Sequence, residues 1–299
     1  MPLRPLDNAL PLAPERTKKP AKVIAPVQNQ PDSGVNDENS VPIPPATTDA
    51  AIDYVSSENL KPFPDPDTKI KGLLEGLESK DWLRVCGSLN DARRFALYHS
   101  SHLLPILEKV MQVLLMATKS PRSALCKTSI MASADVFNAF GDKLLEGPTS
   151  GVFEQLLLQL LLKASQDKRF VCEEADRALN SMVGSMTPLP LLHRLRAYVT
   201  HANLRVRAKT AVSIFHCASK MDLEAMEEYG LVALVQVAGD LLNDRLPEAR
   251  EAARGIVGSI YEKVTEKEDR KQEAWHAFCQ SNLHASHAQS LVKVISSSQ

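Results

Sequence analysis

The side chains that could act on a substrate or bind a metal match no catalytic pattern in this sequence. The motifs GxxxxGKS/T, GxGxxG, HExxH and GxSxG are absent. Two histidine pairs are spaced to share one face of a helix, namely His99 with His102 and His284 with His287. Neither pair has a cysteine or carboxylate at the offset of a third metal ligand. The carboxylates of 173–176 are explained by ion pairing on a solvated helix face. We therefore expect no enzyme activity, no metal and no cofactor.

The five cysteines show neither CxxC spacing nor another pairing pattern. Cys86, Cys126 and Cys172 occupy the same position of a repeated helical phrase, so they should lie on neighbouring helices, about 8–10 Å apart. A disulfide needs Cα atoms within about 7 Å. We expect small core residues in a reducing compartment.

The helical phrase recurs at intervals of about 35 to 46 residues after residue 80. Its copies are 82–97, 122–137, 168–183, 203–218 and 245–260. The eighth position is small in the last four copies, which have Ser129, Ala175, Thr210 and Ala252 there. The fourth position is apolar in every copy except the last, which has Glu248. A helical repeat of this length predicts a stacked solenoid, an architecture that usually serves as a binding surface.

Apolar periodicity and helix breakers divide the chain after residue 61 into helical hairpins. We call the first helix of each hairpin the A helix and the second the B helix. The expected pairs are 61–79 with 82–98, 102–118 with 121–140, 150–165 with 166–184, 188–200 with 203–220, 223–243 with 245–264, and 267–280 with 284–297. Asp67 or Thr68 is expected to cap the first helix, and Gly230 to bend the fifth A helix. No stretch shows the period-two pattern of a strand. The predicted fold is all-α, a solenoid of about six HEAT-type hairpins.

Composition separates the N-terminal region from the rest. Most of the 19 prolines lie before residue 67, and few aromatic residues do. Residues 1–61 are therefore predicted to be a disordered Pro-rich arm, and residues 62–299 the helical repeat domain. The net charge of −1 gives no global attraction to nucleic acid or to an anionic membrane. The longest apolar run, 156–162, is too short to cross a bilayer, so we expect a soluble intracellular protein.

The turns within the hairpins must all emerge on one edge of a solenoid, because each hairpin repeats the orientation of the last. Every one of the first five turns carries a basic residue, and the first adds a tryptophan: Lys80 and Trp82; Lys119 and Arg122; Lys168 and Arg169; Arg205; Arg245. This composition is typical of protein interaction sites. The helix macrodipole disfavours basic residues at a helix start by a few tenths to about 1 kcal/mol, so their recurrence there favours a role in binding. Charged surface turns are also ordinary, and Trp82 either packs across the first A helix or contacts a partner.

The order of these turns resembles the TOG domains of the CLASP and crescerin-like microtubule regulators. The resemblance rests on the Asp-Trp pair at 81–82, on 122–123, on 167–169 and on the Asn-x-x-Val-Arg segment 203–207, and it covers about residues 62–295. It implies a flat paddle of six HEAT pairs whose intra-hairpin turns bind tubulin dimers. Trp82 looks like the family's first-turn tryptophan, which packs on tubulin. Arg122, Lys168, Arg169, Asn203 and Arg205 look like the polar contacts that follow it in the family. Arg245, in the basic row of turns, is a further candidate on the same edge.

The resemblance thus implies a non-catalytic, cytoplasmic and cytoskeleton-associated module whose partner is αβ-tubulin or the microtubule, with the N-terminal arm serving other proteins. The alternative is a general HEAT or armadillo scaffold that binds a peptide or protein on the face formed by the B helices. Candidate contacts on that face are Asn90, Asp135, Asp176 and Arg254. A partner other than tubulin would favour this second function.

Overall fold

A computed structural model of the 299-residue chain describes residues 54–297, which contain helices and no strand. The main A helices are α1 Pro66–Leu77, α4 Leu107–Thr118, α6 Thr149–Ala164, α8 Pro188–Leu195, α11 Leu231–Leu242 and α13 Lys271–Asn282. The B helices are α2 Trp82–Tyr98, α5 Ser123–Phe140, α7 Arg169–Ser185, α9 Leu204–Ala218, α12 Pro247–Val264 and α14 Ala285–Ser296. Shorter pieces are η1 Ser57–Asn59, α3 Ser100–Leu103, η2 Leu104–Ile106, η3 Gly141–Leu145, η4 Arg196–Tyr198 and α10 Leu223–Tyr229. No helix in this range is long and apolar enough to span a bilayer.

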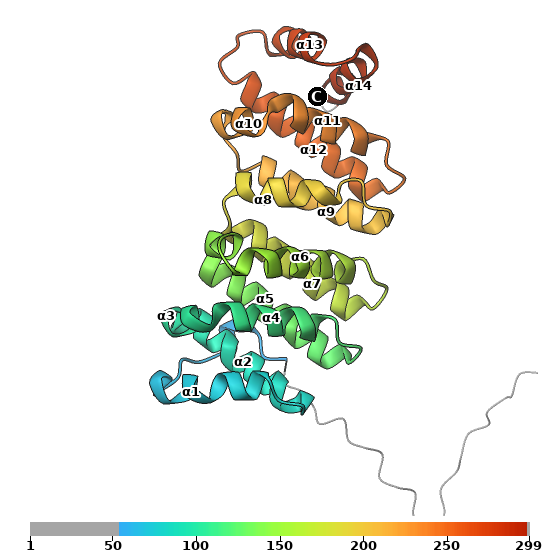
Figure 1. The fold of residues 1–299 in the computed structure, drawn as a ribbon. Coiled ribbons are helices and arrows are strands. Elements are labelled where there is room, and N and C mark those ends of the chain that lie inside the picture. Colours follow the sequence, from blue (N-terminus) through green and yellow to red (C-terminus); the bar gives the residue numbers. More distant parts are fainter. Residues whose placement is uncertain (1–53, 298–299) are drawn as a thin grey trace, which may run out of the picture. The chain divides into compact units, whose positions relative to one another are not determined.

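The hairpins stack in sequence order, from α1 at the blue end to α14 at the red end (Figure 1). The B helices α2, α5 and α7 pack side by side, as do α9 and α12, while α4 packs on α6 in the other layer. The core lies between the two layers, where the wide apolar face of α6 is fully buried. The predicted all-α solenoid of HEAT-type hairpins is confirmed.

Small side chains let neighbouring B helices approach closely. The eighth-position residues Ser129, Ala175, Thr210 and Ala252 are all buried. Between α9 and α12 the approach is so close that a Cβ atom built on Gly255 would lie 2.5 Å from the ring of Phe215. The distance between neighbouring B helices is therefore set by the size of these few residues.

Two A-helix predictions are corrected at their N-terminal ends. The cap of α1 is Asp65 and not Asp67 or Thr68, because Asp65 Oδ1 accepts the N–H of Thr68 at 3.0 Å. The expected helix 102–118 is broken: α3 ends at Leu103 and α4 begins at Leu107. Pro105 lies between them, and a proline removes a backbone donor and crowds the preceding turn.

The expected bend at Gly230 is a complete break between α10 and α11. Gly230 has φ +100° and ψ +101°, a conformation that side-chain-bearing residues rarely adopt. Its N–H still bonds to the carbonyl of Met226 at 3.0 Å, which closes the end of α10. The fifth A helix is therefore two helices joined at one residue.

The folded part begins before residue 62, because residues 54–64 pack against α2 and α5. We call this segment the N-terminal strap. Side chains of α2 hold its backbone: Tyr98 Oη donates to Leu60 O at 2.7 Å, and Arg94 Nε donates to Lys61 O at 2.7 Å. Phe63 is buried 4.8 Å from the ring of Phe95. The rest of the predicted 1–61 arm lies outside the described residues and stays a prediction.

A buried ion pair anchors the strap. Arg93 Nε donates to Asp135 Oδ2 at 2.7 Å, and the two side chains are 1% and 3% exposed. Arg93 also donates to Val55 O at 2.7 Å, and the hydroxyl of Ser57 donates to Asp135 Oδ1 at 2.7 Å. The strap thus supplies the partners that a buried charge pair requires.

The close contact at Gly255 predicts opposite effects of two alanine substitutions in α12. Gly255→Ala should lower the free energy of unfolding by about 1–3 kcal/mol, because the Phe215 ring must move. Gly258→Ala, where a Cβ meets nothing within 4 Å, should raise it by about 0.5–1 kcal/mol. Urea denaturation of both variants measures the difference, and equal effects would contradict the packing described here.

The buried ion pair predicts a large cost when one partner is removed. Asp135→Ala should destabilise the domain by about 3–5 kcal/mol, because Arg93 keeps an uncompensated buried charge. The double variant Arg93→Met/Asp135→Leu should recover much of that loss. Arg84→Ala is the control, since its 2.7 Å pair with Glu75 is exposed and should contribute little. Similar losses for Asp135→Ala and Arg84→Ala in urea melts would rule out the anchoring role.

Candidate protein-binding edge

The turns inside the first five hairpins lie along one edge of the stack, on the right in Figure 1. They are the segments 78–81, 119–122, 165–168, 199–203 and 243–246. We call this row, with the first residues of the B helices that follow, the turn edge. The loops between hairpins lie on the opposite edge, as the predicted repetition of orientation requires.

Four of the five turns close by the same local hydrogen bond. In each of them, a side-chain oxygen accepts the backbone N–H of the residue two positions later, at 2.9–3.2 Å. The pairs, with the acceptor first, are Asp81 and Leu83, Ser120 and Arg122, Asn203 and Arg205, and Asp244 and Leu246. Short polar side chains favour this turn because they replace the backbone acceptor that a helix start lacks. The turn residues are thereby fixed in position before any partner is present.

Contacts between turns join the first three into a row. The guanidinium of Arg122 lies 5.3 Å from the ring centroid of Trp82, a cation–π arrangement. Lys168 Nζ donates to the hydroxyl of Ser123 at 3.2 Å. Trp82 is half-buried, so part of its ring remains accessible at the surface.

The row continues through the fourth and fifth turns. Arg205 donates to Asp167 Oδ1 at 2.5 Å and to the carbonyl of Ser165 at 3.2 Å. Arg207 donates to Asp244 Oδ2 at 2.9 Å and to the carbonyl of His201 at 2.8 Å. Each turn is therefore tied to the next.

The predicted site residues are brought together on this edge, but they differ in how many of their polar groups are free. Arg122, Lys168 and Arg245 are exposed and make no ion pair within residues 54–297. Arg169 pairs with Glu173 at 2.7 Å, and Arg205 pairs with Asp167. These hydrogen bonds to carboxylates raise the pKa of both guanidinium groups. Their roles in partner binding stay predictions.

Three exposed apolar side chains near the edge were not predicted from the sequence: Leu83, Met116 and Phe170. Phe170 stands at the third position of its phrase, where the other copies have Arg84, Ala124, Arg205 and Pro247. That departure is a signal in the sequence that could have identified it. Met116 lies off the buried stripe of α4. The edge therefore combines basic and apolar groups, as interaction sites do.

Other chemically active groups are engaged in packing. His99 accepts the N–H of Phe63 at 3.2 Å, and His102 pairs with Asp67. Within residues 54–297 no three His, Cys, Asp or Glu side chains are grouped to hold a metal. Cys86 and Cys126 are buried and Cys172 is half-buried, and burial raises the pKa of each thiol. A raised pKa disfavours the reactive thiolate.

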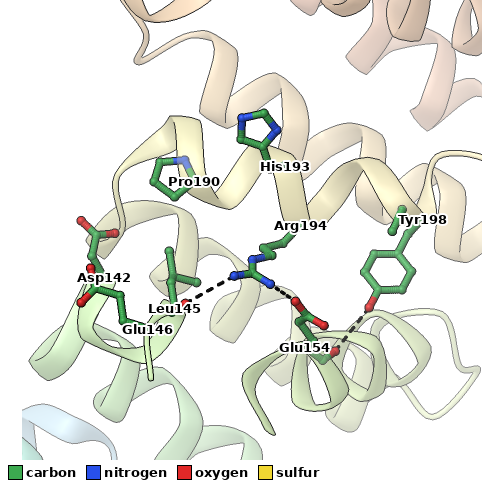
Figure 2. Close-up of a pocket in the computed structure, with 9 residues that line it drawn as sticks. Asp142, Leu145, Glu146, Glu154, Pro190, His193, Arg194 and Tyr198 are labelled. Carbon is green, nitrogen blue, oxygen red and sulfur yellow. Dashed lines mark hydrogen bonds and ion pairs between the residues drawn. The ribbon is translucent and has the colours of Figure 1, made fainter. Parts of the chain in front are cut away.

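A hollow of about 640 Å³ lies away from the turn edge, between α6 and α8 (Figure 2). Several of its polar groups form bonds within the domain: Arg194 reaches from α8 to Glu154, and Tyr198 donates to the carbonyl of Glu154 at 3.3 Å. Asp142 accepts the N–H of Thr187 at 2.7 Å. These bonds hold the fourth hairpin on the third, so we assign the hollow a structural role.

The architecture is a stack of helical hairpins, and solved structures share it. A TOG domain of C. elegans Zyg9 superposes with a TM-score of 0.55 at 14% identity, covering 80% of this chain and 88% of that one. A chain from a study of microtubule plus end tracking by XMAP215, CLIP-170 and EB1 gives a TM-score of 0.52 at 16% identity, covering 75% and 95%. This chain therefore shares the fold of these TOG-domain structures, and the resemblance predicted from the sequence is confirmed.

Among curated proteins, this chain is similar to TOG array regulator of axonemal microtubules protein 1. Identity is 27% over 198 residues with the Mus musculus protein and 27% over 129 residues with the Homo sapiens protein. The matches cover 66% and 43% of this chain but only 11% and 7% of those proteins. The chain thus matches a small part of the length of these relatives. No family model matches it.

The Asp244 contacts predict a pH-dependent contribution to stability. Burial by itself would raise the pKa of Asp244, but hydrogen bonds from the Leu246 N–H and from Arg207 outweigh it and lower the pKa. The stabilisation is therefore fully present above the unfolded-state pKa of about 3.9 and is lost as pH falls through the folded-state pKa. Asp244→Asn should cost about 1–3 kcal/mol at pH 7 and progressively less below about pH 4.

Urea denaturation between pH 7 and pH 3 measures this difference. The matched control is Asp167→Asn, which removes an exposed carboxylate from the same edge and should leave stability nearly unchanged. A cost for Asp244→Asn that does not shrink in acid would show that the charge of Asp244 is unimportant.

Proposed function

We propose that this domain binds αβ-tubulin or microtubules, without catalysis, through the turn edge. The observation that carries the proposal is the continuous row of turn contacts that presents Trp82 together with the basic side chains Arg122 and Lys168. The TOG fold and the similarity to proteins named as regulators of axonemal microtubules support it. We place the interaction in the cytoplasm, at the cytoskeleton.

In this mechanism Trp82 is the apolar anchor and the basic residues select an acidic partner surface. A half-buried tryptophan that is already oriented by Arg122 loses little side-chain freedom on binding. Arg122, Lys168 and Arg245 supply positive charge because no carboxylate of residues 54–297 pairs with them. Arg169, Arg205 and Asn203 contribute directional hydrogen bonds, the last through its side-chain NH₂ because its oxygen caps α9. Recruitment of other proteins is left to the N-terminal arm.

The B-helix face is the less favoured site. On α2 and α5 that face is already covered by the N-terminal strap, which bonds to Asp135 and Arg93. Arg93 also donates to the side-chain oxygen of Asn90 at 3.1 Å. Farther along, Lys209 bridges Asp176 and Glu248 at 3.1 and 2.9 Å, so those charges are paired within the domain. A peptide on this face would first have to displace such contacts.

Binding of the full chain to αβ-tubulin tests the proposal. Trp82→Glu and Lys168→Glu/Arg169→Glu should each weaken the complex at least tenfold at low salt, because one removes the anchor and the other reverses two charges. The charge-reversed variant should also lose part of the salt dependence. The dissociation constant is measured by size-exclusion shift or fluorescence titration at several salt concentrations.

The matched control is Lys267→Glu/Lys271→Glu, which makes the same charge change on two exposed residues away from the turn edge. Lys267 lies in the loop before α13, and Lys271 is the first residue of α13. This control variant should bind like the wild-type chain. If the wild-type chain binds and none of these variants alters the affinity, the turn edge is not the site. If the wild-type chain does not bind tubulin, the function itself is wrong.

A further inference from the structure

An apolar groove opens between the first and second turns of the turn edge. It is lined by residues from four helices that end or begin there: Leu77, Val85, Val113, Met116, Ala117 and Leu125. Its volume is about 430 Å³. Leu77, Val85 and Ala117 are buried at the floor of the groove, whereas Val113, Met116 and Leu125 reach the surface. The groove is therefore part of the edge that carries Trp82 and Arg122.

Met116 forms the outer wall and is unusually exposed. Its side chain is 65% exposed, the highest value among the large apolar side chains of residues 54–297. The other methionines in that range are buried. An unbranched thioether adapts to irregular apolar surfaces and is common at binding sites. Exposure beside a groove, instead of on an isolated patch of surface, indicates a contact surface.

The two turns beside the groove carry three exposed basic residues, and their acidic residues are engaged within the domain. Glu78 pairs with Lys109, and the Asp81 side chain accepts the N–H of Leu83. Ser120 lines the groove, and the exposed residues Lys119 and Arg122 stand on either side of that turn, with Lys80 in the turn opposite. None of these three cations forms an ion pair within the described part of the chain. Charge complementarity therefore selects a partner whose carboxylates surround one projecting apolar side chain.

We propose that this groove receives a single aliphatic or aromatic side chain from an acidic protein surface, and that Met116 closes over it. The inference rests on the proposed function: the partner is the tubulin surface that meets the turn edge. Trp82 then projects into the partner, while the partner projects into the groove. A hollow of this size is at the small end of ligand-binding pockets, so it fits one side chain and excludes a folded element.

The test uses the full chain with αβ-tubulin. Met116→Asp should weaken binding about tenfold, because a charge replaces the apolar wall, whereas Met116→Leu should bind like the wild-type chain. Both substitutions are at an exposed position and should leave the fold intact, which circular dichroism verifies. Met116→Leu should not change the melting temperature, whereas Met116→Asp places a carboxylate in the last turn of α4 and should lower it by only a few degrees.

The matched control is Leu104→Asp. Leu104 is 45% exposed and lies before α4, one helix length from the turn edge, so the same kind of substitution there should not alter affinity. Peroxide footprinting gives an independent readout, since exposed methionine is oxidised to sulfoxide and buried methionine is protected. Tubulin should slow the oxidation of Met116 at least threefold in the wild-type chain.

The outcomes separate this inference from the proposed function. Weakened binding by Met116→Asp, with protection of Met116, supports the groove. Binding that depends on Trp82 but not on Met116, with no protection, overturns the groove and leaves the function intact. Absence of any wild-type binding overturns both, and equal loss in Leu104→Asp and Met116→Asp overturns the groove as a specific site.

Discussion

Close approach of neighbouring B helices is the constraint on which the rest of this domain depends. The small residues at the eighth position of the last four phrases, together with Gly255, set how near one hairpin lies to the next. That spacing brings each turn within reach of its neighbour, so that Arg122 reaches Trp82 and Arg205 reaches Asp167. A larger side chain at Ser129, Ala175, Thr210 or Ala252 would push neighbouring hairpins apart and weaken the contacts between their turns. Packing in the core therefore determines the geometry of the surface that we propose as the binding site.

Electrostatics on the turn edge reflects a balance between internal pairing and charges left for a partner. Asp167, Glu173 and Asp244 neutralise basic groups of the edge within the domain. Those pairs fix the shape of the turns, and exposed pairs add little to stability. The positive charge that remains on Lys80, Lys119, Arg122, Lys168 and Arg245 lies mostly around the first three turns, beside Trp82 and the apolar groove. Recognition by this edge should accordingly be concentrated toward its N-terminal half.

Features that follow from local pattern were predictable from the sequence. The limits of α2 agree with the expected 82–98 because a capping aspartate precedes them and apolar periodicity fills them. The common edge of the turns followed from hairpin repetition alone. The break at Pro105 was missed because the apolar pattern runs on across it. Met116 was missed because one exposed apolar residue on a mostly apolar helix leaves no distinct pattern, and the bonds between turns depend on contacts about 40 residues apart in sequence.

The N-terminal strap packs through long-range contacts that a local sequence pattern does not reveal. It also determines where the folded domain begins. The apolar residues of 54–64 follow neither a helix nor a strand period, so nothing nearby in sequence indicates that they pack. Their partners lie up to 78 residues away. A recombinant fragment that started at Pro66 would look complete by its helices. It would nevertheless uncover the Phe95 ring and leave Arg93 without the Val55 carbonyl and the Ser57 hydroxyl. The practical N-terminal limit of an independently folding unit therefore lies at or before Tyr54.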